Sequence, residues 1–165
     1  MNITLDFKDY FWNMQIALEE GINAYYNDEV PIGACIISND GRLLSRAKNN
    51  KEKMNDPCGH AEILAIRDAC QKNNNWRLNG AIIFVTLEPC PMCLSAILQT
   101  RIEKLIFGAY DLKGGAISLG YHFHKDKRLN HSFKIIGGMM HYECSKILSQ
   151  FFREKRSKYK AVPKK

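Results

Sequence analysis

The sequence predicts a single α/β domain with three layers, in which helices cover both faces of a mixed central sheet of about five strands. Three observations support this prediction. The chain has 165 residues, the length of one domain, and it shows no internal repeat or low-complexity linker. Helical stripes of apolar residues alternate with short apolar runs of strand length. A chain of this size buries roughly 70% of its unfolded surface, so it can form a core without disulfides.

The first third of the chain predicts one helix followed by a β-hairpin. We expect the apolar stripe of this helix to face the core, and its members are Phe7, Phe11, Met14, Leu18 and Ile22. Pro31 ends the structure that precedes it. The apolar run 32–37 and the segment 42–47 flank an Asn-Asp-Gly sequence at 39–41, and this turn composition predicts a hairpin.

The middle of the chain predicts helices and strands in alternation. After a polar loop, residues 62–70 carry apolar side chains at helical spacing, and three asparagines at 73–75 end that helix. The apolar, β-branched run 81–86 suits a buried strand. Residues 91–100 follow as a helix with a proline in the first turn, and residues 104–109 predict the fourth strand.

The last third predicts a fifth strand at 132–136 and a closing helix. The apolar side chains of this helix follow the i, i+3, i+4, i+7, i+8 pattern and are Cys144, Ile147, Leu148, Phe151 and Phe152. We assign residues 1–156 to the folded domain and residues 157–165 to a basic C-terminal tail. Seven basic residues and one acidic residue lie between Arg153 and Lys165. This charge suits a polyanion such as RNA, and a solvated, frayed chain end explains it equally well.

Composition narrows the class of protein. Six cysteines without a secretory leader in the first residues indicate a reducing, cytoplasmic compartment, where thiols serve as metal ligands or as core atoms. Cys35, Cys70 and Cys144 lie in apolar patterns and are expected to pack in the core. No apolar stretch approaches the roughly 20 residues that a membrane helix needs, so we expect a soluble protein with no membrane partner.

Two short segments carry the residues of a metal site. His60 and Glu62 stand at the start of one predicted helix, and Cys90 and Cys93 lie where a strand runs into the next helix. Helix N-termini favour negative charge, which we expect to lower the pKa of both cysteines toward the thiolates that bind metal. One imidazole and two thiolates give three ligands, and a zinc ion with three protein ligands keeps one position for water.

Glu62 is the residue that would turn a metal site into an enzyme. A carboxylate two residues beyond a ligand histidine can take a proton from water and give it to a leaving nitrogen. Residues two apart in a regular helix point to different sides, so this role requires a non-ideal first turn. By themselves, His60 and Glu62 could be ordinary residues of a helix start, and the cysteine pair could be redox-active or part of a zinc knuckle. Both segments together, with Pro89 before Cys90, favour the metal enzyme.

The order His-x-Glu followed by Pro-Cys-x-x-Cys resembles the signature of the zinc deaminases of cytidine, deoxycytidylate, guanine and nucleic-acid bases. The sequence is more closely similar to the family of bacterial tRNA-specific adenosine deaminases, which convert the wobble adenosine of an arginine tRNA to inosine. This similarity extends from the first helix to Arg156. The segments that carry it are 29–34, 56–57, 60–63, 85–90, 95–97, 101–102, 107–109, 130–131 and 151–153.

The resemblance implies a cytidine-deaminase-like fold, hydrolytic deamination of adenosine in tRNA, and a homodimer whose two subunits shape each RNA site. It implies one zinc ion (Zn²⁺) per subunit, bound by His60, Cys90 and Cys93, with Glu62 as the catalytic proton carrier. The substrate is then a loop nucleotide flipped out of its stack, because stacked bases are out of reach.

The resemblance also implies a set of substrate contacts. Asn49 is expected to hold the flipped nucleoside, although its sequence context alone would make it a plain turn residue. The backbone around Ala61 and Glu88 is expected to read the base edge. Arg153, together with Lys155 and Arg156, is expected to hold the flanking phosphates, and Phe152 is a candidate for the pocket mouth whose helical spacing also fits the core.

The chain departs from the family pattern at Tyr110, where an arginine is frequent, and in the loop 121–128. An aromatic ring at position 110 could still stack on a base or a sugar. Two other functions remain open. A small-molecule deaminase of guanine, cytosine or a nucleotide would use the same metal set, and a non-catalytic zinc RNA-binding module would not need Glu62.

Overall fold

A five-stranded mixed sheet forms the centre of the protein. The computed structural model describes residues 7–160. Its strands are β1 (Gly33–Ile37), β2 (Leu43–Lys48), β3 (Ile82–Leu87), β4 (Lys104–Ala109) and β5 (Lys134–Gly137), in the spatial order β2-β1-β3-β4-β5. The strand β1 runs antiparallel to β2 and β3, whereas β3, β4 and β5 are parallel. The predicted mixed sheet and the hairpin are therefore confirmed.

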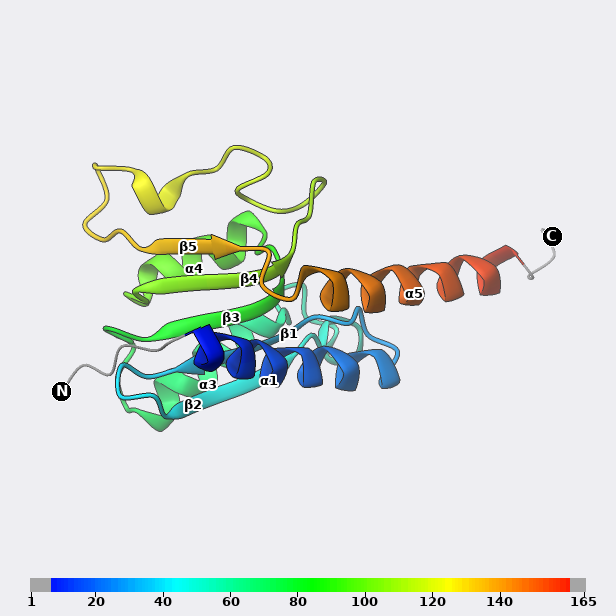
Figure 1. Ribbon diagram of the computed structural model, residues 1–165, viewed down its shortest axis with the longest axis horizontal. Coiled ribbons are helices and arrows are strands. Elements are labelled where there is room, and N and C mark those ends of the chain that lie inside the picture. Colours follow the sequence, from blue (N-terminus) through cyan, green and yellow to red (C-terminus); the bar gives the residue numbers. More distant parts are fainter. Residues whose placement is uncertain (1–6, 161–165) are drawn as a thin grey trace.

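Helices cover both faces of this sheet, which confirms the three-layer prediction (Figure 1). The helices α1 (Phe7–Tyr26) and α5 (His141–Lys160) lie on the near face, and α3 (Ala61–Lys72) and α4 (Pro91–Gln99) lie behind the sheet. Each face of the sheet carries its own hydrophobic core, and alternate residues of β3 point into one or the other. Ile83 and Val85 pack toward α3 and α4, whereas Phe84 packs toward α1 and α5. No helix among residues 7–160 is long and apolar enough to cross a membrane.

The buried face of α1 differs from the predicted stripe. Met14 and Ala17 are fully buried, whereas Phe11 and Ile22 are more than a third exposed. The reason is the close approach of α1 to β1, where a Cβ atom on Gly33 would lie 2.1 Å from a backbone oxygen of α1. Only small side chains fit this contact, so the larger apolar residues lie on the flanks of the helix. The side chain of Phe7 is outside the part of the chain that the structure describes.

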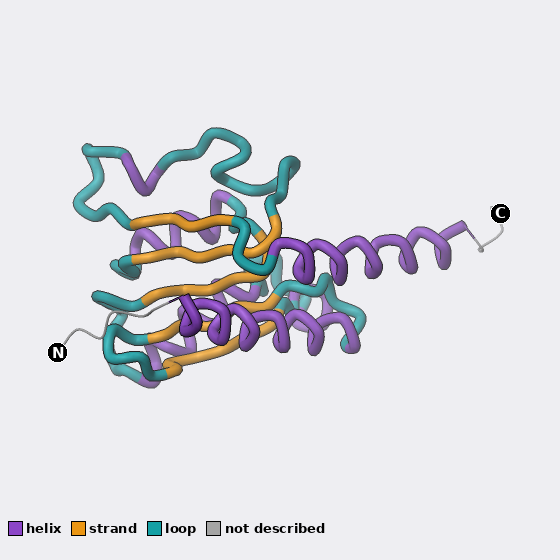
Figure 2. The backbone as a smooth tube through the Cα atoms, in the orientation of Figure 1, coloured by secondary structure: helices purple, strands orange, loops and turns teal. Residues whose placement is uncertain are grey.

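The helix α5 starts against the sheet and then extends beyond it, as the tube in Figure 2 also shows. Cys144, Leu148 and Phe151 of its predicted stripe are buried, but Phe152 is 42% exposed, so its expected place in the core is wrong. Its ring contacts that of the buried Phe151, and the rest of the side chain is left to solvent. The helix crosses the proposed boundary at 156 without a break and ends at residue 160, and residues 161–165 of the proposed tail lie outside the described residues.

Two short helical turns lie in segments that the sequence left as loops. The helix α2 (Lys51–Met54) interrupts the polar loop before α3, and the 3₁₀ turn η1 (Phe123–Lys125) lies in the loop between β4 and β5. Apolar periodicity could not reveal them, because α2 has no buried residue and η1 is only three residues long.

Candidate metal centre and active site

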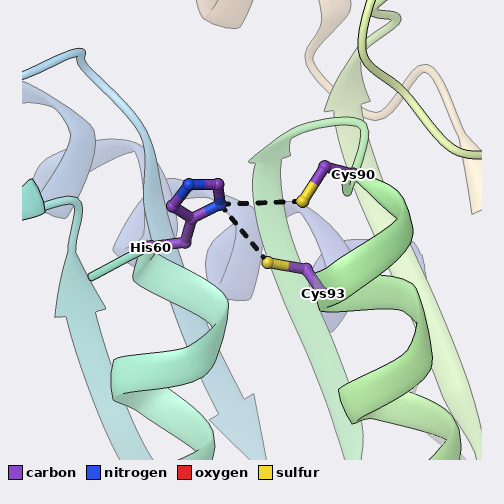
Figure 3. A group of neighbouring side chains, drawn as sticks. All are labelled: His60, Cys90 and Cys93. Carbon is purple, nitrogen blue, oxygen red and sulfur yellow. Dashed lines mark hydrogen bonds between the residues drawn. The ribbon is translucent and has the colours of Figure 1, made fainter. Parts of the chain in front are cut away.

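The three predicted ligands meet at the N-termini of two neighbouring helices. His60 immediately precedes α3, and Cys90 immediately precedes α4, each with an extended backbone conformation. Cys93 lies in the first turn of α4, which Pro91 begins. Proline favours this first position, since its fixed φ suits a helix and its missing N–H would have no partner there. The helix starts thus aim the three side chains at one point, as Figure 3 shows.

The distances within this group fit a zinc ion. Nδ1 of His60 lies 3.7 Å from Sγ of Cys90 and 3.5 Å from Sγ of Cys93. Zn–N bonds of about 2.0–2.1 Å and Zn–S bonds of about 2.3 Å at tetrahedral angles put nitrogen and sulfur about 3.6 Å apart. Among the described residues, no fourth side chain joins the group. The donor set is therefore that of a zinc site with one position free for a small ligand.

The two thiols do not behave alike, contrary to the expectation that both pKa values fall. The pKa of Cys90 is lowered to about 4, mainly because the Cys93 thiol donates a hydrogen bond to it, with His60 adding to the effect. The pKa of Cys93 is raised, because it is the donor in this pair and because it is buried. The pKa of His60 is also raised, chiefly by its hydrogen bond with Cys90. The metal-free set thus holds negative charge at Cys90 and a proton at Cys93.

Glu62 lies against the same group and is 4% exposed. Because His60 precedes the helix in an extended conformation, the two side chains can face one cluster although they are two residues apart. The backbone N–H of Glu62 donates to its own carboxylate. Burial raises the pKa of Glu62 to about 7, and the negative charge of Cys90 acts in the same direction. A carboxyl group with a pKa near neutrality can both take and return a proton.

Asn49 is 4% exposed, and its side-chain amide donates a hydrogen bond to Glu29, so it is a buried and fixed residue rather than a plain turn residue. It follows the last residue of β2, and its backbone N–H donates to the carbonyl of Ile32. The next residue, Asn50, donates its backbone N–H to the carbonyl of Gly59, which directly precedes His60. The segment that carries Asn49 is therefore tied to the segment that carries the metal ligand.

Ala61 and Glu88 were expected to offer backbone atoms to a base. Ala61 is the first residue of α3, so its N–H has no acceptor within the helix and is free to serve a ligand. The backbone N–H of Glu88 is already donated to the carbonyl of Ala109 at 2.8 Å, which leaves its carbonyl.

The side chain of Glu88 has a task that the sequence did not reveal. Its buried carboxylate accepts hydrogen bonds from the backbone N–H groups of Asp111 and Ser118 and from the Ser118 hydroxyl. It thereby fixes the loop that follows β4 beside the cysteine segment. Only the contact with a distant loop identifies this role, so no local pattern could have found it.

The basic residues of α5 divide into two kinds. Arg153 and Arg156 are exposed and form no ion pair with any residue in the described range 7–160. Lys155 instead pairs with Asp28 at 2.7 Å and helps to hold α5 against the end of α1. Since β5 runs parallel to β3, α5 begins at the sheet edge where the cysteine segment lies. The exposed Phe152 and the two free arginines are thus carried away from that edge on one helix (Figure 1).

Comparisons with known proteins agree with this geometry. The chain matches the MafB19-like deaminase family over residues 8–156. The tRNA-specific adenosine deaminase of Bacillus subtilis is 43% identical over 151 residues, which cover 92% of this chain and 93% of the relative. A structure from a study of A-to-I editing by tRNA:A34 deaminases at the wobble position superposes with a TM-score of 0.78 at 42% identity, covering 83% of this chain and 99% of the other.

A guanine deaminase from Bacillus subtilis is more distant, with 30% identity, a TM-score of 0.59 and 71% coverage of each chain. The fold and the His-Cys-Cys group define this protein as a hydrolytic deaminase. Identity over nearly the full length of both chains places it more narrowly, and it belongs to the family of tRNA-specific adenosine deaminases.

Proposed function

We propose that this protein converts the wobble adenosine in the anticodon loop of tRNA, specifically arginine tRNA, to inosine. The observation that supports it best is the buried Glu62 against the group of His60, Cys90 and Cys93, in a chain 43% identical to a tRNA-specific adenosine deaminase. The same family resemblance supports a cytoplasmic homodimer.

The reaction exchanges one bond for another at C6 of adenine. A zinc ion held by the three ligands would lower the pKa of a water molecule to about 7 and so supply the nucleophile. Glu62 accepts a proton from the attacking water and delivers it to the amino nitrogen. The new C6–O bond remains, the C6–N bond breaks, and ammonia leaves. Burial of Glu62 suits this shuttle, because a carboxyl pKa near neutrality loses and regains a proton easily.

The nucleoside must leave its stack to reach Glu62. Asn49 and the backbone N–H of Ala61 are the polar groups proposed to hold it. Arg153 and Arg156 are free to contact flanking phosphates, and we no longer assign that role to Lys155 because Asp28 holds it. Phe152, exposed on the same turn as these arginines, is proposed to contact an adjacent nucleotide.

The discriminating experiment compares substrates. Purified protein is incubated with an arginine-tRNA anticodon stem-loop and, separately, with free adenosine, guanine and cytosine, and the products are measured by mass spectrometry. We expect inosine at the wobble position and no turnover of the free compounds. Preferred turnover of a free base would replace the proposal by a small-molecule deaminase.

The role of Glu62 is tested by Glu62→Ala and Glu62→Gln. Both variants are expected to keep about one zinc ion per chain and to lose turnover by about 10²-fold or more, since proton transfer is removed while the ligands remain. Glu20→Gln is a matched control, because Glu20 is also largely buried but pairs with Arg46. Full activity of Glu62→Ala would remove Glu62 from the mechanism, whereas RNA binding without ammonia release by the wild-type protein would indicate a non-catalytic zinc module.

A further inference from the structure

Glu29 is a buried carboxylate outside the metal cluster, and it lies in the turn between α1 and β1. It is 1% exposed and has no cationic partner among residues 7–160. Both of its oxygen atoms are used, because the backbone N–H of Lys53 donates to Oε1 at 2.8 Å and Nδ2 of Asn49 donates to Oε2 at 3.0 Å. A carboxylate is costly to bury, so its retention at this position calls for a specific task.

The carboxylate determines which way the amide of Asn49 points. An ionised carboxylate only accepts hydrogen bonds, so the amide must turn its NH₂ group toward Glu29. The Oδ1 atom of Asn49 then has no hydrogen-bond partner among the described residues. This atom is not fully buried, so a ligand can reach it. Asn49 therefore presents a free acceptor beside the segment that carries His60.

We infer that Glu29 is a positioning residue that fixes the Asn49 amide with its carbonyl oxygen available to a hydrogen-bond donor of the bound nucleoside. This inference rests on the proposed function, in which Asn49 contacts the flipped nucleoside. Without Glu29 the amide can rotate and offer N–H groups instead, so the site would meet a substrate donor with another donor. The contact with the backbone of Lys53 fixes Glu29 itself, since it joins the turn before β1 to α2.

An exchange of hydrogen-bond polarity tests the pair. In Glu29→Gln, Oε1 can still accept from Lys53, but the new NH₂ group faces the NH₂ group of Asn49 and forces that amide to rotate. In Asn49→Asp, two carboxylates face each other. In the double variant, the NH₂ group of Gln at position 29 donates to Asp at position 49, whose second oxygen again offers an acceptor. Both the pair and the free acceptor are then restored with the net charge of the wild type.

The variants are compared by kcat/KM on the stem-loop, by zinc content and by urea unfolding. Each single variant is expected to lose about tenfold or more in kcat/KM, with zinc content unchanged. In Glu29→Gln the rotated Asn49 amide turns a donor toward the donor of the substrate, and in Asn49→Asp two carboxylates face each other. The double variant is expected to recover at least half of that loss on a logarithmic scale and to be more stable than either single variant. Glu20→Gln is again the control, because it removes a buried carboxylate that does not contact Asn49.

Three results would overturn the positioning role of Glu29, and a fourth would refute the proposed function. Wild-type kcat/KM in Glu29→Gln, or a double variant that is no faster and no more stable than Glu29→Gln, overturns the inference. A destabilised Glu29→Gln variant whose kcat/KM is not restored by Asn49→Asp shows a purely structural carboxylate and also overturns it. Absence of inosine with the wild-type protein is a different result, because it refutes the proposed function before any variant is made.

Discussion

The loop after β4 is held by Glu88, and replacing this residue with glutamine should loosen it measurably. The carboxylate is 2% exposed and accepts from the backbone N–H of Asp111 at 3.0 Å, from the backbone N–H of Ser118 at 2.7 Å and from the Ser118 hydroxyl at 2.6 Å. Glutamine keeps one acceptor and gains an NH₂ group. The hydroxyl can reverse its role and accept, but one backbone N–H must then face a donor.

The magnitude follows from this count. One buried backbone N–H left without a partner costs about 1 to 3 kcal/mol, and the remaining bond loses about 1 kcal/mol when its acceptor is no longer charged. The free energy of unfolding of Glu88→Gln should therefore fall by about 2 to 4 kcal/mol. At about 2 to 4 °C per kcal/mol for a chain of this size, the melting temperature should fall by roughly 5 to 15 °C.

Urea unfolding measures this loss, and hydrogen exchange locates it. The backbone amides of Asp111 and Ser118 should exchange faster in Glu88→Gln, because they lose their charged acceptor. Ser118→Ala is the matched comparison, since it removes only the hydroxyl and should cost about 1 kcal/mol. A loss below about 0.5 kcal/mol in Glu88→Gln, within the range of ordinary surface substitutions, would refute the view that this carboxylate anchors the loop.

Three further predictions concern other parts of the fold. Gly33→Ala should destabilise the protein by about 1 to 3 kcal/mol or more in urea, because its Cβ would lie 2.1 Å from the backbone of α1; unchanged stability would contradict that contact. Arg153→Ala and Arg156→Ala should each reduce the salt dependence of RNA binding by about 0.7 in log–log slope, and Lys155→Ala by less; equal effects of all three would contradict the division. Lys155 lowers the pKa of Asp28, so their contact stabilises above the ordinary aspartate pKa and is lost as the pH falls through the lowered value. The melting temperatures of the wild type and Asp28→Asn should therefore differ at neutral pH and converge in acid.

Much of the fold follows from the sequence because its strands are short apolar runs with clear boundaries. The run 104–109 coincides with β4. The predicted hairpin strands 32–37 and 42–47 differ from β1 and β2 by one residue at three of their four ends and coincide at the fourth. The face of α1 could not be predicted from apolar spacing. Close packing on Gly33 selects small residues for the buried side, and a search for large apolar residues identifies the flanks instead.

In the candidate site, too, some features follow from short sequence motifs and others depend on contacts that form only in the fold. The metal ligands and Glu62 lie in two short segments at helix starts, so each segment can be recognised from its own spacing, and the contact between α3 and α4 brings the two segments together. The opposite pKa shifts of Cys90 and Cys93 could not be foreseen, because they arise mainly from the interaction between the two thiols in the folded helix start, with the backbone N–H of Cys93 adding to the lowering at Cys90.

Substrate choice is not contained in the metal group, because a guanine deaminase with the same fold is also similar to this chain. The features that can distinguish a nucleotide within RNA from a free base must lie around that group. We propose that they are the Asn49 acceptor held by Glu29 and, further along α5, Arg153 and Arg156, which form no ion pair within residues 7–160. The first would contact the nucleoside and the second its neighbours along the strand. A variant that loses the arginines should therefore lose affinity for the stem-loop while keeping its rate on bound RNA, whereas loss of Glu29 should reduce the rate on bound RNA as well.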